Sequence, residues 1–360
     1  VIHAKGGDYR RWYGNLEYCV DWLDGQSEML SHRSCVIRNR DYYFREGVTW
    51  SHTGLQFGAR ILPSGLTFNV EAPTFFSEVD DRLILAALNS CVTTYLFQSI
   101  YQSLHFLAGD VMNLPFLALT ESEEEIVKDA VDKCVALSRD DWNRSEASFE
   151  FQRPRLVRTE SNYLKDLWTE IEREHATHVN LMRESEERIN LTYIARFGLK
   201  GYLSPSIQGG RVSLGQLSRA DEVQNLISYA VGCMFGRYAL EKPGLILANQ
   251  GDAIENYLRR VPEPTFPADD DNVIPMLDGD WFNDDIAERF RKFLRVAFGD
   301  EHYEANLKFV EKALGKNGKA RDIRDYFLKD FYNDHVRRYK KRPIYWLFSS
   351  PKGSFNALIY

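Results

Sequence analysis

The sequence lacks the patterns that mark several classes of protein. Its five cysteines show no C-x-x-C spacing, which argues against a zinc site and against a disulfide framework. No apolar run approaches the roughly 18–20 residues that cross a bilayer, so we expect no membrane partner. Asp and Glu outnumber Lys and Arg by 52 to 45, which excludes a general attraction to nucleic acid. We therefore expect a cytoplasmic protein whose binding surfaces are local.

The chain of 360 residues is long enough for two or three domains. Residues 1–118 contain short extended patterns at 42–44, 47–50 and 57–62, and the last of these ends at a Pro-Ser-Gly turn. A single amphipathic helix is predicted over 82–96, because its apolar residues recur at steps of three and four. Together these patterns predict a mixed α+β domain.

A pair of long helices is predicted over residues 119–205. Thr120 stands three residues before Glu123, the spacing of a capping box, and predicts a helix from about 121 to 139. Ser161 is a candidate cap for a second helix that ends near Phe197 and Gly198. This helix could exceed 30 residues, or about 50 Å. We expect the two helices to fold back on each other as an antiparallel spacer.

Residues 206–360 predict a mainly α-helical C-terminal domain. Helices are expected at 223–238, 286–298, 303–314 and 320–339, and a passage rich in Pro, Gly and Asp separates the first two at 261–279. The predicted fold class is therefore α+β, with a mixed domain, a long helical pair and a mainly helical domain in that order.

Three local clusters of cations and aromatic residues are candidate DNA contacts, because phosphates attract cations and base edges need long polar side chains. In the stretch 31–60, five arginines oppose two carboxylates, a balance of +3. A solvated loop with core aromatic residues is the alternative for this stretch. Its candidates are Arg38, Arg40, Tyr42, Tyr43, Arg45 and Trp50.

The other two clusters lie near the ends of the chain. Lys5, Arg10 and Arg11 surround a flexible Gly-Gly pair, and they could equally form a structural junction. Arg337, Arg338, Lys340 and Lys341 make up the densest basic run. Charge runs are usually solvated, but the apolar stretch that follows would hold this one rigidly at the surface.

Metal and catalytic sites are not predicted. His175 and His178 lie one turn apart with Glu172 and Glu174 nearby, but such groupings on surface helices arise often by chance. The carboxylates at 269–271 are expected to face solvent. Cys233 and Met234 fall in an apolar helix and are expected in the core.

Several segments together resemble the C-terminal half of the PglX-type adenine-specific DNA methyltransferases of BREX phage-defence systems. In the first domain they are DYYFREGVTWS at 41–51, FGARILPSGLTFNVEAPTFF at 57–76 and AGDVMNLPF at 108–116. In the third they are SYAVGCMFGRYALEKPGLILAN at 228–249, TFPADDDNVIPM at 265–276 and KRPIYWLFSS at 341–350. The resemblance implies that residues 1–118 are a target-recognition domain like those of restriction-modification enzymes. It also implies double-stranded DNA as partner, S-adenosylmethionine as cofactor of the intact enzyme, and contacts with its N-terminal methyltransferase domain and other BREX proteins.

The sequence departs from the family where the chemistry would be. An (Asp/Asn)-Pro-Pro-(Tyr/Phe) motif holds the flipped adenine in such enzymes, and no Pro-Pro pair occurs here. The nearest string, at 113–116, is Asn-Leu-Pro-Phe. A Phe-x-Gly-x-Gly turn for S-adenosylmethionine is also absent. Since the chain begins at Val1 rather than Met, we expect it to be an inactive segment of an active methyltransferase.

Two other functions remain open on the sequence alone. One is a protein-interaction scaffold of a defence complex, which the many acidic residues permit. The other is a nuclease built on the acidic residues of the third domain, although no PD…(D/E)xK-like spacing stands out.

Overall fold

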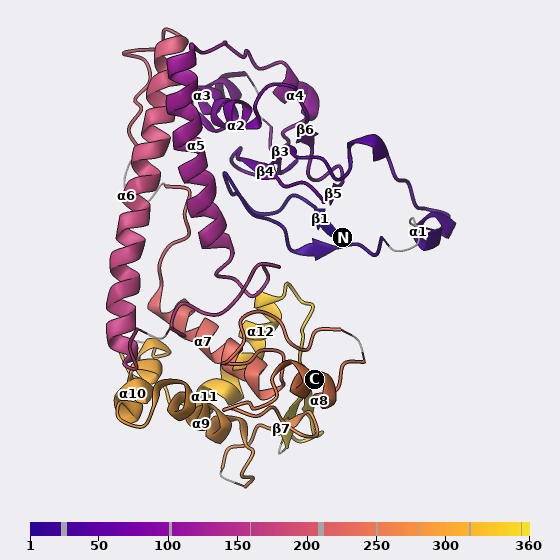
Figure 1. Ribbon diagram of the computed structural model, residues 1–360, viewed down its shortest axis with the longest axis vertical. Coiled ribbons are helices and arrows are strands. Elements are labelled where there is room, and N and C mark those ends of the chain that lie inside the picture. The colour runs from indigo at the N-terminus through magenta and orange to yellow at the C-terminus, as the bar shows by residue number, and fades with distance from the viewer. Residues whose placement is uncertain are drawn as a thin grey trace. The chain divides into compact units, whose positions relative to one another are not determined.

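A computed structural model describes residues 1–22, 27–100, 103–158, 160–207, 212–249, 251–279, 281–316, 318–353 and 355–360. It combines helices with small sheets, which confirms the predicted α+β class (Figure 1). The chain forms two compact units, each built from two stretches of sequence. The first unit comprises Val1–Asn143 and Ala176–Gln216, and the second comprises Arg144–His175 and Leu217–Tyr360. The division of the sequence into three domains, with boundaries at residues 118 and 205, remains a prediction.

Two three-stranded sheets lie in the first unit. One has the order β2 (Tyr18–Cys19), β1 (Ile2–Ala4), β5 (Thr67–Phe68), and the other has the order β4 (Ala59–Leu62), β3 (Gly47–Trp50), β6 (Thr74–Phe75). The predicted strands at 47–50 and 57–62 are confirmed, the second over its last four residues. The extended segment predicted at 42–44 is wrong. Asn39 is left-handed with φ of 55°, and the chain forms a single 3-10 turn, η2 (Arg40–Tyr42), before β3.

The prediction of a single helix over 82–96 is wrong, because the helix is interrupted at Ser90. The structure has two helices there, α2 (Asp81–Asn89) and α3 (Cys91–Ile100), at 57° to each other. Ser90 is extended, and its hydroxyl donates to the Ala87 carbonyl at 2.8 Å and accepts from the Thr93 amide at 3.3 Å. A serine side chain that binds nearby backbone groups in this way competes with the helical pattern. Two short helices, α1 (Ser27–Ser31) and α4 (Ala108–Met112), complete this part of the first unit.

No single helix among the described residues has both the length and the apolar composition of a membrane span. Only α2 and α3 taken together pass that test, as a bent pair.

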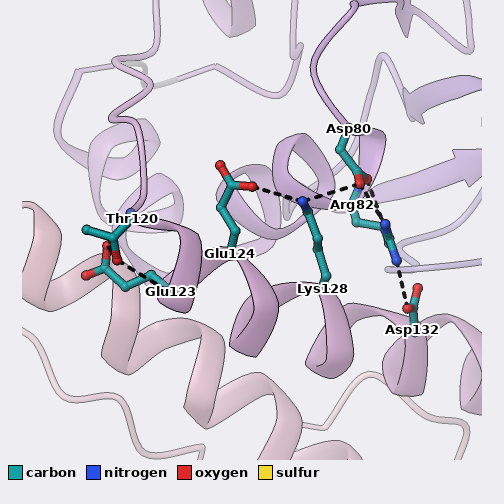
Figure 2. A network of polar contacts seen from close by, with 7 residues as sticks. All are labelled: Asp80, Arg82, Thr120, Glu123, Glu124, Lys128 and Asp132. Carbon is teal, nitrogen blue, oxygen red and sulfur yellow. Dashed lines mark hydrogen bonds and ion pairs between the residues drawn. The ribbon is translucent and has the colours of Figure 1, made fainter.

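The capping box at Thr120 is confirmed. The Thr120 hydroxyl accepts from the Glu123 amide at 3.3 Å, and a Glu123 carboxylate oxygen accepts from the Thr120 amide at 2.8 Å (Figure 2). This box begins α5 (Glu121–Trp142). One turn further, Lys128 lies 2.9 Å from Glu124 and 3.7 Å from Asp80 at the start of α2. The pair of Lys128 with Asp80 therefore joins the N-terminal part of α5 to the start of α2.

The long helix α6 (Leu164–Arg196) ends, as predicted, before a left-handed Gly198. Three contacts between a basic and an acidic side chain connect its second half to α5, with nitrogen to oxygen distances of 3.5 to 3.9 Å. Their numbers rise in α5 as they fall in α6, so the two helices run antiparallel (Figure 1). The pairs are Glu123 with Arg196, Asp129 with Arg188, and Asp140 with His178. Between the helices lies an apolar core that includes Val131, Cys134, Met182 and Ile189.

The second unit is mainly helical, as predicted, but it also contains a sheet that was not predicted from the sequence. The sheet has the order β7 (Val273–Pro275), β9 (Asn356–Ile359), β8 (Trp346–Ser349). A π-helical turn at Phe327–Phe331 interrupts the helix predicted over 320–339. The helices are α7 (Arg219–Met234), α8 (Ile254–Arg260), α9 (Ile286–Phe298), α10 (Tyr303–Ala313), α11 (Ile323–Tyr326) and α12 (Tyr332–Arg338). Cys233 and Met234 are fully buried in α7, which confirms their predicted place in the core.

A buried histidine holds the chain where it leaves α12 for β8. His335 is 2% exposed, and its Nε2 accepts from the backbone amides of Ile344 at 2.9 Å and Tyr345 at 3.1 Å. Accepting two amides requires an unprotonated Nε2. Burial, with the charges of Arg338 and Arg237 nearby, lowers the pKa of His335 to about 4.

This histidine makes stability depend on pH. Between the unfolded pKa of about 6.5 and the folded pKa of about 4, the unfolded chain binds a proton that the folded chain does not. The contribution of His335 is therefore complete above pH 6.5 and is lost as the pH falls toward 4, by on the order of 2–3 kcal/mol. The variant His335→Gln keeps an acceptor that does not titrate, and we expect a smaller loss of stability on acidification than in the wild type. Urea unfolding at pH 7, 6 and 5 measures the difference, and equal losses for both proteins would contradict the assignment.

Candidate nucleic-acid interface

The arginine segment, residues 38–45, is held in a fixed conformation on the first unit. Its backbone turns at two non-glycine residues with positive φ, Asn39 at 55° and Phe44 at 67°. The Phe44 amide donates to the Leu66 carbonyl at 2.8 Å, and the Gly65 amide donates back to the Phe44 carbonyl at 3.0 Å. These bonds tie the segment to the turn before β5 and set the direction in which its side chains leave the backbone.

Aromatic rings pack around this segment. The Tyr43 ring lies 5.1 Å from Phe68 and 5.5 Å from Trp22, in edge-to-face contacts. Burial raises the pKa of Tyr43, as expected for a phenol among other rings. Tyr42 is exposed and packs against Phe76, with ring centres 5.1 Å apart. Of the two tyrosines, Tyr42 is the more exposed, since Tyr43 is half-buried.

The three arginines of the segment are exposed. The Arg45 guanidinium lies 5.4 Å from the ring centre of Tyr42 and 5.4 Å from that of Phe76. Neither Arg38 nor Arg40 makes an ion pair with a carboxylate in the described part of the chain. Their charges are thus available to an external anion or base edge.

Trp50, at the end of β3, is buried, unlike the exposed arginines of the segment. Its side chain is 1% exposed, and its indole nitrogen donates to the Phe106 carbonyl at 2.9 Å. It packs on Phe57 at 6.1 Å in the core of the first unit. A side chain so enclosed has no surface for a DNA contact, so its position supports a packing role.

Arg60 does not contribute to the surface charge of the stretch 31–60, because it is buried. It is 1% exposed, and its guanidinium donates to the Arg10 carbonyl at 3.3 Å. Burial lowers its pKa to about 10. The surface of this stretch therefore carries four arginines against two carboxylates, a balance of +2 instead of +3.

The N-terminal cluster is largely engaged within the protein. Arg10 pairs with Asp141 at 2.7 Å, donates to the carbonyls of Tyr13 and Ser138, and packs on the Trp142 ring. These bonds tie residues 10–13 to the end of α5, which supports a structural role. Arg11 is half-buried with its guanidinium 5.9 Å from the Tyr9 ring centre. Only Lys5 is exposed, beside the Tyr18 ring.

The basic run at the end of α12 is split between surface and interior. Arg337 is exposed and pairs with Asp334 at 2.8 Å, whereas Arg338 is half-buried and bonded to the Asn225 side chain. Lys340 and Lys341 are both left-handed, with φ of 50° and 65°, and both are exposed. The run therefore presents Arg337, Lys340 and Lys341 to solvent.

The acidic residues considered as metal ligands serve other purposes. Both oxygens of Glu174 accept from the Arg158 guanidinium at 2.8 Å. Asp269 is buried and pairs with Arg289 at 2.9 Å, although the sequence analysis expected it to face solvent. Across the described ranges, no group of three His, Cys, Asp or Glu side chains is placed to hold a metal.

A second basic site escaped the sequence analysis. Lys165, Arg219, Lys308 and Lys312 line one hollow in the second unit, although they come from three helices far apart in the sequence. Lys165 and Arg219 are isolated cations in their own segments, and no unbroken charge run contains any of the four. The only local signal is the spacing of four between Lys308 and Lys312, which places both on one face of a helix.

Comparison with known proteins gives no matching family model. The chain is 33% identical, over 391 aligned positions, to the adenine-specific methyltransferase BrxX of Escherichia coli O9:H4 (strain HS), covering 99% of this chain and 32% of that protein. It is also 33% identical, over 381 positions, to the adenine-specific methyltransferase PglX of Lacticaseibacillus casei (strain Zhang), covering 99% of this chain and 31% of that protein. The chain thus spans about a third of the length of each relative. Along nearly its whole length, the chain belongs to the PglX family of BREX adenine-specific methyltransferases.

Proposed function

We propose that this chain is the DNA-recognition and C-terminal region of an S-adenosylmethionine-dependent, adenine-specific DNA methyltransferase of a BREX-type phage-defence system. The observation that carries the proposal is the arginine segment. Its three exposed arginines stand on a fixed aromatic base, and neither Arg38 nor Arg40 forms an ion pair with any residue that the structure describes. The chain that carries this segment matches two adenine-specific methyltransferases over 99% of its length. In this proposal residues 1–118 read the target, 119–205 act as a spacer, and 206–360 hold the duplex or contact other BREX proteins.

Base reading is assigned to Arg38, Arg40 and Arg45. An arginine can donate two hydrogen bonds to the O6 and N7 atoms of one guanine, the commonest specific contact in the major groove. Arg45 is supported by the rings of Tyr42 and Phe76, which lowers the entropy that it loses on binding. Because its backbone is fixed at Asn39 and Phe44, the segment can present these donors in one geometry.

Phosphate contacts are assigned to exposed cations. In this proposal Lys5 contacts a phosphate from the first unit, and Arg337, Lys340 and Lys341 do so from the second, because all four side chains are exposed. Arg10, Arg11, Arg338 and Trp50 are left out, because their side chains are engaged or enclosed within the protein. Tyr43 supports the segment from within the aromatic cluster.

The methyl-transfer chemistry is assigned to the N-terminal methyltransferase domain of the intact enzyme. Neither the adenine-binding motif nor the glycine-rich cofactor turn occurs in this sequence. S-adenosylmethionine and the flipped adenine would bind to that domain, and this chain would place the target before it.

A protein-interaction role for the second unit has one observation in its favour. Trp346 and Phe348 lie on β8, an edge strand, and are 65% and 55% exposed. Large apolar side chains beside unpaired strand groups are typical of surfaces that bind another protein. The nuclease alternative gains no such support. Asp285 caps α9 and pairs with Arg324, and Asp269 pairs with Arg289.

We predict that the purified chain transfers no methyl group to DNA and binds no S-adenosylmethionine. The reason is the absence of both motifs from the sequence. Transfer of labelled methyl groups and titration calorimetry with the cofactor test the two halves of this prediction. A positive result in either would overturn the assignment of the chemistry to another domain.

We predict that at least one of the single variants Arg38→Ala, Arg40→Ala and Arg45→Ala relaxes or abolishes methylation of the cognate site by the intact enzyme. A lost bidentate contact costs roughly 1–3 kcal/mol of discrimination, or about 5- to 150-fold. Site-resolved methylation sequencing measures the effect, and thermal unfolding confirms that each variant is folded. Arg33→Ala, at another exposed arginine, is the matched control. Normal methylation by all three variants would place base reading elsewhere in residues 1–118.

We predict that replacing Arg337, Lys340 and Lys341 with glutamine weakens binding to all duplexes about equally. Each lost phosphate contact should lower the slope of log affinity against log salt by about 1. Fluorescence anisotropy from 50 to 200 mM NaCl measures the slope. If the slope does not change, the run faces solvent or a partner protein.

A further inference from the structure

The second unit contains a hollow of about 600 Å³ between the first turns of α6 and α7 and one face of α10. Lys165, Thr169 and Glu172 follow one another at helical steps along α6, and Lys308 and Lys312 are four apart on α10. Arg219 is the first residue of α7, directly after its cap Ser218. Residues of one helix at such spacings share a face, so α6 and α10 each turn a polar face to the hollow, and α7 adds Arg219.

Buried polar contacts fix the walls of this hollow. Asn306 on α10 is fully buried, and its side chain accepts from the Leu164 amide at 2.9 Å and donates to the Asn162 carbonyl at 2.9 Å. The rings of Tyr163 and His302 stack 5.1 Å apart beside these bonds. The start of α6 is thereby attached to α10, and the cations on the two helices cannot separate without breaking buried hydrogen bonds.

The hollow has a strong excess of positive charge in an acidic chain. Four cations oppose one carboxylate, Glu172, whereas the whole chain carries a net charge of −7. Within the described part of the chain, none of the four cations forms an ion pair. Like charges gathered in one hollow repel each other, and a bound anion would relieve that repulsion.

The aromatic residues at the hollow favour a phosphate over a stacked base. Trp168 is only 8% exposed, Tyr163 is covered by His302, and the Arg219 guanidinium lies 5.8 Å from the Phe309 ring centre. Trp168 is thus enclosed, and Tyr163 and Phe309 each have one ring face already covered by a neighbouring side chain. Lysine ammonium groups act as point charges that suit phosphates without demanding a fixed orientation.

We propose that this hollow binds phosphates of the DNA backbone, without regard to sequence, as a contact separate from the run at 337–341. The inference rests on the proposed function, since it takes DNA as the partner. The three lysines and Arg219 neutralise the phosphates, and Glu172 limits how tightly they are held.

The test compares two triple variants of the full chain that change the net charge equally. The first replaces Lys165, Lys308 and Lys312 with glutamine and keeps Arg219, which packs on Phe309. The control replaces three exposed lysines outside the hollow, Lys292, Lys319 and Lys352, with glutamine. Anisotropy on a duplex of 30 base pairs over a range of NaCl concentrations gives the salt slope of each. We expect the slope of the first variant to fall by about 1 to 3 and that of the control to stay close to wild type.

A third variant is expected to bind DNA more tightly, a result that a misfolded protein would not give. Glu172 is exposed, so Glu172→Gln should leave the fold intact while it removes a carboxylate that lines the hollow. We expect this variant to bind the duplex about 2- to 5-fold more tightly than wild type at low salt.

The outcomes separate this inference from the proposed function. If the wild-type chain binds the duplex and neither the hollow variant nor Glu172→Gln changes that binding, the inference is wrong and the proposed function stands. If the wild-type chain shows no salt-dependent binding at all, the proposed function fails and the inference fails with it. Binding of inorganic pyrophosphate that the first variant loses, with DNA binding unchanged, would assign the hollow to a small phosphate ligand and overturn the DNA contact.

Discussion

The antiparallel packing of α5 on the second half of α6 is the contact on which the rest of the first unit depends. Their shared apolar core also takes in residues of α2, α3 and the sheet around β3. Glu186 on α6 is 3% exposed and accepts from the Trp12 indole nitrogen at 2.8 Å and from the Ser213 hydroxyl at 2.6 Å. A buried carboxylate is costly without such donors, so these bonds draw the N-terminal segment and the stretch after α6 onto the helix pair. The arginine segment is held to the body assembled in this way.

Polar groups shape the second unit in a similar manner. Asp285 is fully buried, caps α9 through the Ala287 amide and pairs with Arg324 at 2.8 Å. Glu146 accepts from the hydroxyls of Ser228 and Tyr339, which belong to α7 and to the turn after α12. Removing one partner of such a group would leave a buried charge or acceptor unpaired, which costs more than the bond itself contributes. The bond of Glu146 to Tyr339 and the bonds of His335 to Ile344 and Tyr345 hold the basic run to the body of the second unit.

The contrast between global and local charge is central to the proposed function. A chain with a net charge of −7 is not drawn to DNA as a whole, so its contacts must be few and well placed. The exposed arginines of the first unit and the cations of the second meet this requirement, whereas Arg10, Arg289 and Arg324 are paired with carboxylates and largely buried. Arginines of this second kind maintain the fold.

Local signals in the sequence determined the elements whose causes lie within a few residues. The capping box at Thr120, the end of α6 at Gly198, α9 and the strand Gly47–Trp50 follow from side-chain spacing and turn chemistry, and the similarity to PglX-type enzymes was visible in short segments. Only the tertiary structure decided which cations and aromatic residues reach solvent. Trp50 bonds to Phe106, Arg10 to Asp141, and the hollow joins Lys165 to Lys312, in each case across more than 50 residues. Burial is set by such distant contacts, and periodicity along one segment does not report them.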